Sequence, residues 1–348
     1  MIAAGVAMEE VDQRLEAMLS ERVEQAERAG PAYQRLWMRI RSAVRGGKRI
    51  RPQLLLMAHA EISGTRVEDA VTAAAAFELL HTALLIHDDM LDRDLVRRGA
   101  TNLQGDFLAQ ALETDGSFQA ATAWSDAAGL LAGDLLISAA HALVGEITAP
   151  AGAALRSLLD ECLFVTAAGE LADIGLAVGV LDRSVDGIMQ MMRDKTAAYS
   201  FAAPLRAAAM LAGSGPEFDA DLAEIGTRLG FVYQLRDDLL GVFGSEEALG
   251  KSVDSDLRAG KSTLLVAYAD GTDAWEEVRH LFGRRSADAD DVHRMRDALV
   301  ASGARSRAEE LLDQQRVACV DHIGRSDLPS GLRGALTRLT HRCAERES

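Results

Sequence analysis

The apolar stretch at residues 67–92 sets the strongest limit on the fold of this chain. It reads VEDAVTAAAAFELLHTALLIHDDMLD, is rich in the strong helix formers Ala and Leu, and contains no Gly or Pro. A helix that is apolar on nearly every side has to be covered on every side. We therefore expect this helix to be buried at the centre of a large bundle of other helices.

The rest of the chain supplies the helices that such a bundle needs. Only six Pro occur in 348 residues, and there are no alternating runs rich in Val, Ile and Thr that would predict a large sheet. We expect an all-α protein, a single large helical bundle in one domain over residues 1–348. Helices are predicted at residues 8–29, 31–44, 52–62, 67–92, 125–147, 151–177, 182–213 and 217–243, with four shorter ones from residue 261 onward. Residues 99–124 are predicted to be a loop or a partly helical flap.

The net charge and the cysteines indicate which partners and which compartment to expect. A formal charge of −16 repels nucleic acid, but it permits an anionic substrate if bound cations or a local basic pocket reverse the field. The three Cys are far apart and lack metal-ligand spacing, which predicts reduced thiols in a cytoplasmic protein. No run approaches the roughly 18 apolar residues of a membrane span, so we expect no transmembrane segment.

Two predicted helices end in clusters of carboxylates. Asp88, Asp89 and Asp92 end the central helix, and Asp88 and Asp92 share one helix face. Asp237 and Asp238 end another long helix. An isolated triplet of this kind would be a solvated helix end, but unpaired carboxylates on a buried helix are costly and usually hold a metal or another cation. Two such clusters facing each other would suit Mg²⁺, completed by substrate phosphate and water.

Basic residues are grouped beside these carboxylates. Each alone would be an ordinary surface charge, but together, in an acidic protein, they indicate a polyanionic ligand bridged through metal. They lie in a glycine turn, directly after the first cluster, and near the later one: Lys48, Arg49, Arg51, Arg97, Arg98, Lys195, Lys251 and Lys261.

Five segments, in this order, resemble the trans-isoprenyl diphosphate synthases. They are GGKRIRP at 46–52, HTALLIHDDMLD at 81–92 followed by RRG, KTAAYS at 195–200, YQLRDDLL at 233–240 and GKSVDSDLRAGKST at 250–263. The match covers roughly residues 40–270 and resembles the geranylgeranyl or longer-chain branch. It implies the helical bundle of the isoprenoid synthase type, with a central cavity, and a homodimer.

The resemblance also implies a reaction. An allylic diphosphate ionises, the alkene of isopentenyl diphosphate attacks the cation, and a proton is lost. The implied activity is a Mg²⁺-dependent head-to-tail (1′-4) condensation that gives diphosphate and a chain of about twenty carbons, geranylgeranyl diphosphate.

Carried over by position, the resemblance gives each site residue a role. Mg²⁺ would be bound by Asp88, Asp92 and Asp237, supported by Asp89 and Asp238. The allylic diphosphate would be held by Arg97, Lys195, Lys251 and Lys261. The diphosphate of isopentenyl diphosphate would be held by Lys48, Arg51, His81 and Arg98. Catalysis would involve Lys195 and the oxygen dipoles of Thr196 and Gln234, aimed at the developing cation. Both His81 and Gln234 have an alternative role as polar residues of the helical core.

This sequence departs from the family pattern at three places. Gly241 stands where the second cluster usually has a third Asp, which removes one expected metal contact. The usual Gly-Gln reads Gly169–Glu170, followed by Asp173, and Thr101 replaces a Pro after RRG.

Three other functions fit parts of the same sequence. The GKS at 250–252 and GKST at 260–263 could be P-loops, but Ser245 and Ser255 stand where the leading Gly is required. A terpene cyclase would share the helices and the first cluster, but the basic turn GGKRIRP would then have no role. A catalytically silent partner subunit that binds prenyl diphosphates is the third alternative.

The central helix also predicts product length. In the family, an aromatic residue four or five positions before the first Asp stops growth at fifteen carbons, and here those positions are Leu84 and Ala83. The next large residue on that face is Phe77, roughly 10 Å deeper at about 1.5 Å per residue. That depth favours a product of twenty carbons, unless another helix forms the floor.

Overall fold

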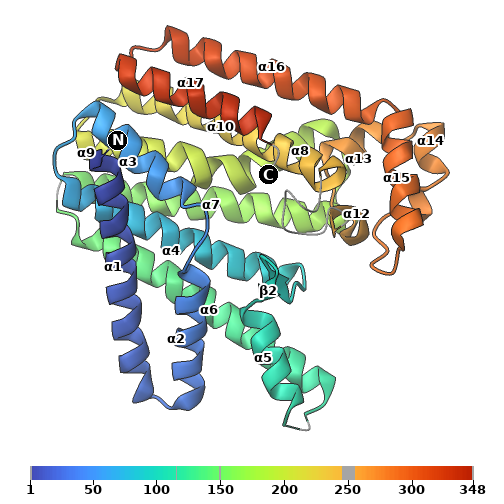
Figure 1. Ribbon diagram of the computed structural model, residues 1–348, viewed down its shortest axis with the longest axis horizontal. Coiled ribbons are helices and arrows are strands. Elements are labelled where there is room, and N and C mark those ends of the chain that lie inside the picture. Colours follow the sequence, from blue (N-terminus) through green and yellow to red (C-terminus); the bar gives the residue numbers. More distant parts are fainter. Residues whose placement is uncertain (1, 115, 149, 245–254, 347–348) are drawn as a thin grey trace. The chain divides into compact units, whose positions relative to one another are not determined.

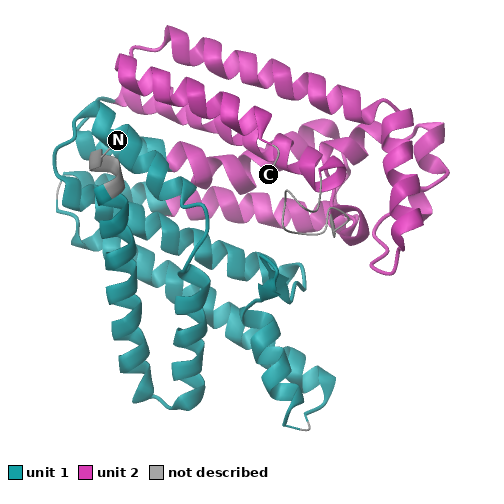
Figure 2. Ribbon diagram, in the orientation of Figure 1, with its two compact units in different colours: residues 1–159, 204–215 teal, residues 160–203, 216–348 magenta. Residues whose placement is uncertain are grey.

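The structure is a computed structural model that describes residues 2–114, 116–148, 150–244 and 255–346 (Figure 1). Its regular elements are helices, apart from one hairpin of two-residue strands within these ranges. The prediction of an all-α protein is confirmed. The chain divides into two compact units, residues 1–159 with 204–215 and residues 160–203 with 216–348 (Figure 2).

The first unit is built around α4 (Val67–Leu91). Every residue of α4 from Ala70 to Leu80 is buried, and α6, α3 and α1 pack against the helix. The prediction that residues 67–92 form a buried central helix is therefore confirmed for this unit. The other helices are α1 (Ile2–Glu27), α2 (Pro31–Val44), α3 (Ile50–Ile62), α5 (Leu103–Leu112), α6 (Phe118–Glu146), the start of α7 (Ala151–Ala177) and most of α9 (Ala203–Ala212).

Residues 99–124 are partly helical, as predicted, because α5 and the start of α6 lie among them. Strands β1 (Val96–Arg97) and β2 (Ala100–Thr101) form a hairpin, α5 follows directly, and α6 begins at Phe118. Gly105 allows close packing within α5, since a Cβ there would lie 2.4 Å from the carbonyl oxygen of Leu95.

The second unit is built around α10 (Pro216–Phe243), which packs against η1, α16 and α17. The predicted helix at 182–213 is present as three consecutive segments, and its middle, η1 (Arg193–Ala202), is a π-helix. π-helical turns are rare and often mark functional sites. The remaining elements are α8 (Val185–Met192), α12 (Ser255–Ala259), α13 (Leu264–Ala269), α14 (Asp273–Glu276), η2 (Arg279–Leu281), α15 (Ala289–Ala301), α16 (Ala304–Arg325) and α17 (Ser330–Glu345).

Two of the described helices, α4 and α6, have the length and composition of membrane-spanning helices. In α4, 78% of the most apolar window is buried inside the protein, and in α6 the buried share is 50%. The hydrophobicity of α4 is thus explained by its position in the core of the first unit.

Arg49 joins three segments of the first unit. It precedes α3 with a left-handed backbone, at φ 50°. Its guanidinium donates to the Glu78 carboxylate at 2.7 Å, to the Asp12 carboxylate at 3.1 Å and to the Val44 carbonyl at 2.8 Å. The Glu78 side chain is only 5% exposed, so Arg49 supplies the counter-charge of a buried carboxylate. This residue of the basic turn has a structural role.

Arg49→Ala is expected to lower the free energy of unfolding by about 3–5 kcal/mol, because it leaves the buried Glu78 carboxylate without its partner. Arg45→Ala, which removes an exposed pair with Glu16, is the matched control and should cost much less. Urea denaturation measures both. The double variant Arg49→Leu/Glu78→Leu should lose less than Arg49→Ala. Equal losses for the two single arginine variants would contradict this role.

Candidate active site

The hairpin after α4 returns an arginine to the first acidic cluster. Its turn is Arg98–Gly99, with φ of 55° and 73°, the left-handed geometry that a two-residue hairpin turn favours. This turn places Arg97 against the end of α4. The Arg97 Nε donates to Asp89 at 2.6 Å and an Nη donates to Asp88 at 3.0 Å. The structure thus brings three of the predicted site residues together.

The three carboxylates of this cluster differ in environment. Asp89 is 3% exposed, and burial raises its pKa against the opposing effect of Arg97. Asp88 is half-buried, and Asp92, which caps the C-terminus of α4, is exposed. Asp88 and Asp92 are therefore the accessible pair on one helix face, able to take a cation, and Asp89 is a buried support.

Helices α5 and α6 hold the acidic end of α4 in place. The Gln104 side chain, 2% exposed, donates to the carbonyl of Ile86 at 2.7 Å and lies against Gly129. The ring of His87 fills the space above Gly133, where a Cβ would come within 2.0 Å of it. Two glycines on α6 therefore let α4 and α5 approach closely, which positions the aspartates that follow.

The basic turn and the hairpin also meet. The Arg98 guanidinium lies against the turn before α3, where a Cβ on Gly47 would come within 2.9 Å of it. His81 is partly buried, and its pKa lies well below the usual value because of burial and then the positive charges of Arg51 and Arg98. A neutral imidazole among arginines is suited to donate a hydrogen bond to an anion. Lys48 is exposed in the same turn.

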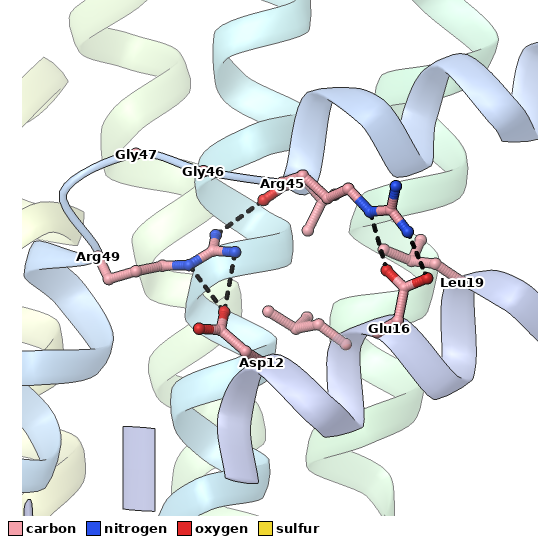
Figure 3. A pocket seen from close by; sticks show the side chains of 9 residues that line it. Asp12, Glu16, Leu19, Arg45, Gly46, Gly47 and Arg49 are labelled. Carbon is pink, nitrogen blue, oxygen red and sulfur yellow. Dashed lines mark hydrogen bonds and ion pairs between the residues drawn. The ribbon is translucent and has the colours of Figure 1, made fainter. Parts of the chain in front are cut away.

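A pocket of about 450 Å³ lies beside this turn (Figure 3). Its floor is apolar, and its charged residues pair with one another. Arg45 donates to Glu16 at 3.0 and 2.6 Å, and Arg49 donates to Asp12. The pocket is lined by Asp12, Leu15, Glu16, Leu19, Val44, Arg45, Gly46, Gly47 and Arg49. Arg49, one of the basic residues singled out in the sequence, lines it, but the residues assigned to metal or diphosphate do not.

The second acidic cluster lies on α10 in the second unit. Asp238 is 4% exposed, and burial raises its pKa to about 7 against the effects of Lys261 and of a hydrogen bond from Gln234. Asp237 is more accessible and pairs with Arg346 at 2.7 Å. The Arg346 guanidinium also stacks over the ring of Tyr233, 3.9 Å from its centroid. The sequence reasoning missed Arg346, because no local pattern connects it with a residue 109 positions earlier.

Three predicted residues form a chain of hydrogen bonds beside this cluster. The Thr196 hydroxyl donates to the Gln234 Oε1 at 3.0 Å, and the Gln234 Nε2 donates to Asp238 at 2.8 Å. Thr196 belongs to η1, whereas the other two lie one helical turn apart on α10. The chain orients the amide of Gln234 and supports Asp238.

Lys195 is held by the residues in which this sequence departs from the family pattern. Its Nζ lies 2.6 Å from the Asp173 carboxylate and 3.0 Å from that of Glu170. A Cβ on Gly169 would lie 2.3 Å from the backbone N of Lys195, so only glycine lets α7 and η1 approach this closely. Glu170 and Asp173 are therefore counter-charges of Lys195, a role that the sequence reasoning did not assign.

Lys261 also has acidic neighbours. Its pKa is raised, above all by Asp256 and to a lesser extent by Asp238, against the cost of burial. Asp256 is a second residue that the sequence reasoning missed, although it lies within the segment GKSVDSDLRAGKST. The predicted Lys251 lies outside the described residues.

The residues present fit Mg²⁺. Across the parts of the chain that the structure describes, no three His, Cys, Asp or Glu side chains form a ready metal cluster. Mg²⁺ often takes only one or two carboxylates and completes its shell with phosphate and water. The donors are hard oxygens, and guanidinium groups already lie against Asp88 and Asp237, which shows that both places favour a cation.

Comparison with known proteins identifies the family. Residues 34–299 match the model of the polyprenyl synthetase family. The chain is 34% identical, over 76% of its length and 79% of the relative, to a geranylfarnesyl diphosphate synthase of Aeropyrum pernix. It is 31% identical, over 87% of its length and 80% of the relative, to a (2E,6E)-farnesyl diphosphate synthase of Mycobacterium tuberculosis.

Among solved structures, a geranylgeranyl pyrophosphate synthase of Corynebacterium glutamicum, complexed with isoprenyl diphosphate and magnesium, is similar with a TM-score of 0.87. It is 28% identical and covers 97% of this chain and 98% of its own. The chain therefore belongs to the polyprenyl synthetase family and is a trans-prenyltransferase by class. The resemblance seen in the five sequence segments is confirmed.

Gly169→Ala is expected to displace η1 and with it Lys195, because the new Cβ would overlap the backbone of Lys195. Overpacking of this kind should lower the free energy of unfolding by about 1–3 kcal/mol and should reduce turnover. Gly145→Ala on α6 is the matched control, since its Cβ would meet nothing within 4 Å. It should stabilise by roughly 0.5–1 kcal/mol. Denaturation midpoints and turnover rates test both, and a neutral Gly169→Ala would contradict the close approach.

Proposed function

We propose that this protein catalyses the Mg²⁺-dependent head-to-tail (1′-4) condensation of isopentenyl diphosphate with an allylic diphosphate. The observation that carries the proposal is that each acidic cluster is accompanied by basic side chains that could bind phosphate. In the first unit, Arg97 contacts Asp88 and Asp89. In the second unit, Lys261 lies in the field of Asp238. Acidic groups for a metal and basic groups for phosphate are what a diphosphate substrate requires.

Both acidic clusters are assigned to the Mg²⁺ that would bind the allylic diphosphate. Mg²⁺ would be held by Asp88, Asp92 and Asp237, with Asp89 and Asp238 as buried supports. When bound, it supplies positive charge to the oxygens of the departing diphosphate. The same oxygens are held by the charged donors Arg97, Lys195 and Lys261, together with Lys251. Charge-assisted hydrogen bonds from these donors favour the charge that develops as the carbon–oxygen bond breaks.

Isopentenyl diphosphate is assigned to the basic turn. Lys48, Arg51, His81 and Arg98 would hold its diphosphate, with His81 donating a hydrogen bond from a neutral ring. The allylic cation is assigned to Thr196 and Gln234, whose side-chain oxygens carry partial negative charge. Because the amide of Gln234 is already oriented by Asp238, its dipole needs no reorganisation when the cation forms.

Asp88→Ala and Asp237→Ala are each expected to reduce turnover by about 10²-fold or more. Each variant removes a carboxylate that would hold Mg²⁺, and the positive charge of Mg²⁺ would stabilise the transition state. The assay measures isopentenyl diphosphate incorporated into prenyl product in Mg²⁺, with Asp297→Ala, an exposed carboxylate on α15, as the control. Circular dichroism checks the fold. Folded variants with activity within several-fold of wild type would contradict the assignment.

The same assay separates the competing functions. A terpene cyclase would consume the allylic diphosphate without isopentenyl diphosphate. A catalytically silent partner subunit would bind both diphosphates and turn over neither.

We propose a product of about twenty carbons, geranylgeranyl diphosphate. Family membership leaves the length open, since the relatives include farnesyl and geranylfarnesyl diphosphate synthases. On α4, the accessible stripe that holds Asp88 continues through Leu84 to His81 and ends at the fully buried segment. Phe77, 1% exposed, is the large aromatic residue of that segment. A central cavity that ends near Phe77 is part of this proposal.

Phe77→Ala is expected to lengthen the product by one or more five-carbon units, because it removes the proposed floor beside α4. Chromatography of the dephosphorylated products compares the variant with wild type. Leu79→Ala, which opens a cavity elsewhere on the same buried helix, is the control and should not change the length. A wild-type product of fifteen carbons would contradict the open path past Ala83 and Leu84. An unchanged product from Phe77→Ala would exclude Phe77 as the floor.

We also propose a cytoplasmic homodimer in which residues 1–348 work as one domain. Phe164 and Leu171 on α7 and Val178 directly after it recur at seven-residue spacing and are 80%, 75% and 67% exposed. An apolar stripe of this kind favours contact with another protein surface. The three cysteines are buried and form no disulfide, as expected in a reducing compartment. The charge of −16 argues against nucleic acid as a partner. A monomer in sedimentation at micromolar concentration would contradict the dimer.

A further inference from the structure

Helix α1 presents two carboxylates, Asp12 and Glu16, to the basic turn between α2 and α3 (Figure 3). They are four residues apart, so they lie about one helical turn from each other on the same face of α1. The segment MEEVDQRLEAM that contains them carries only the charges of an ordinary amphipathic helix. Their contacts with the turn are visible in the structure alone.

Each of the two carboxylates holds the arginine at one end of the turn. The Nε and Nη2 of Arg45 donate to the two oxygens of Glu16 at 3.0 and 2.6 Å, and this contact lowers the pKa of Glu16. The Nε and Nη2 of Arg49 lie 3.1 and 3.0 Å from one oxygen of Asp12. A two-pronged contact between an arginine and a carboxylate fixes direction as well as distance. Both ends of the turn are therefore attached to α1.

The chain between these two arginines is held mainly at its ends. Gly46 and Gly47 have φ of 81° and 87°, in a region where glycine pays no steric penalty and keeps its conformational freedom. The pocket of about 450 Å³ is lined by the turn and by α1, so the turn borders open space on that side. Lys48 is exposed, and its carbonyl accepts a hydrogen bond from Gln53 at 3.2 Å. The position of the glycines thus follows from the ion pairs on either side of them.

The position of the turn decides the geometry of the proposed site for isopentenyl diphosphate. Lys48 of the turn and Arg98 of the hairpin are both assigned to that diphosphate. The Arg98 guanidinium lies so close to the turn that a Cβ on Gly47 would come within 2.9 Å of it. A shift of the turn would change the spacing of these donors. Donors that are already in place bind an anion more tightly, because ordering them on binding costs free energy.

We propose that Asp12 and Glu16 are positioning residues for isopentenyl diphosphate. Through the two arginines they fix both ends of the basic turn, so that Lys48 stands where the diphosphate binds. This inference rests on the proposed function. It differs in sign from simple electrostatics, in which removal of a negative charge near an anion site tightens the binding of the anion. Loss of a positioning carboxylate weakens that binding instead.

The first experiment titrates isopentenyl diphosphate into the full-length protein by calorimetry. Glu16→Gln is expected to raise its Kd about two- to fivefold, the range that an exposed ion pair accounts for. The KM for isopentenyl diphosphate should rise equally, while kcat, the KM for the allylic diphosphate and the melting temperature stay unchanged. Glu10→Gln, an exposed carboxylate on another face of α1, is the control for net charge and should match wild type. Unchanged or tighter binding by Glu16→Gln would overturn the proposal.

A double-mutant cycle tests whether Arg45 acts through Glu16. If it does, Arg45→Gln and Arg45→Gln/Glu16→Gln should weaken binding to the same extent as Glu16→Gln. If Arg45 itself binds the diphosphate, Arg45→Gln will weaken binding more than Glu16→Gln does, and that result would overturn the proposal. Asp12→Asn/Glu16→Gln, which releases both ends of the turn, should weaken binding more than Glu16→Gln alone. Equal binding by these two variants would exclude Asp12 from the role.

The second experiment measures the turn itself and needs no activity. The four lysines of the chain are Lys48, Lys195, Lys251 and Lys261, so a lysine-specific protease releases a short N-terminal fragment only by cutting after Lys48. Exposed loop tips are the preferred sites of such cuts, and a looser turn is cut faster. Glu16→Gln should speed this cut about two- to fivefold, and Glu10→Gln should not. An equal rate for Glu16→Gln and wild type would overturn the proposal.

The two proposals fail in different ways. If the wild-type protein does not bind or incorporate isopentenyl diphosphate, the proposed function fails, but the protease rates still decide whether α1 holds the turn. If wild type is active and Glu16→Gln binds isopentenyl diphosphate as wild type does, the positioning role fails alone.

Discussion

Carboxylates at the end of a buried helix need cations beside them, and the neighbouring segments place arginines there. Asp89 lies almost without exposure at the end of α4, where an unpaired charge would be costly. Arg97 forms an ion pair with Asp89, because a two-residue turn with two left-handed residues folds the chain back on itself. In the second unit, Arg346, which is 109 positions later in the sequence, forms an ion pair with Asp237. In a prenyltransferase these places suit a metal–diphosphate complex.

Residues that break the family pattern are compensated by others close in space. Glu170 replaces an amide, and its added charge pairs with Lys195. Gly241 stands where the family pattern has a carboxylate, and a Cβ there would lie 2.4 Å from the Asp256 carboxylate. In both cases a charged group from another segment lies beside the changed residue. A family motif is therefore better judged by the groups that meet in space than by its letters.

Glycines set the distances between helices around the candidate site. Gly133 accepts the ring of His87, and Gly169 accepts the backbone of Lys195. Each allows a helix that carries a site residue to approach its neighbour more closely than any side chain would permit. Gly105 has the same property within α5, where a Cβ would lie 2.4 Å from the carbonyl oxygen of Leu95.

The sequence by itself determined the helical class, the buried helix at 67–92, the two acidic clusters and the family, because each depends on composition, helical periodicity or the order of short motifs. Only the tertiary structure showed that Arg49 neutralises the buried Glu78, that Arg346 pairs with Asp237, and that Asp256 fills the space at Gly241. These contacts join residues that are 15 to 109 positions apart. Periodicity reports only neighbours within one element, whereas electrostatic and steric contacts depend on distance in space, which folding alone decides.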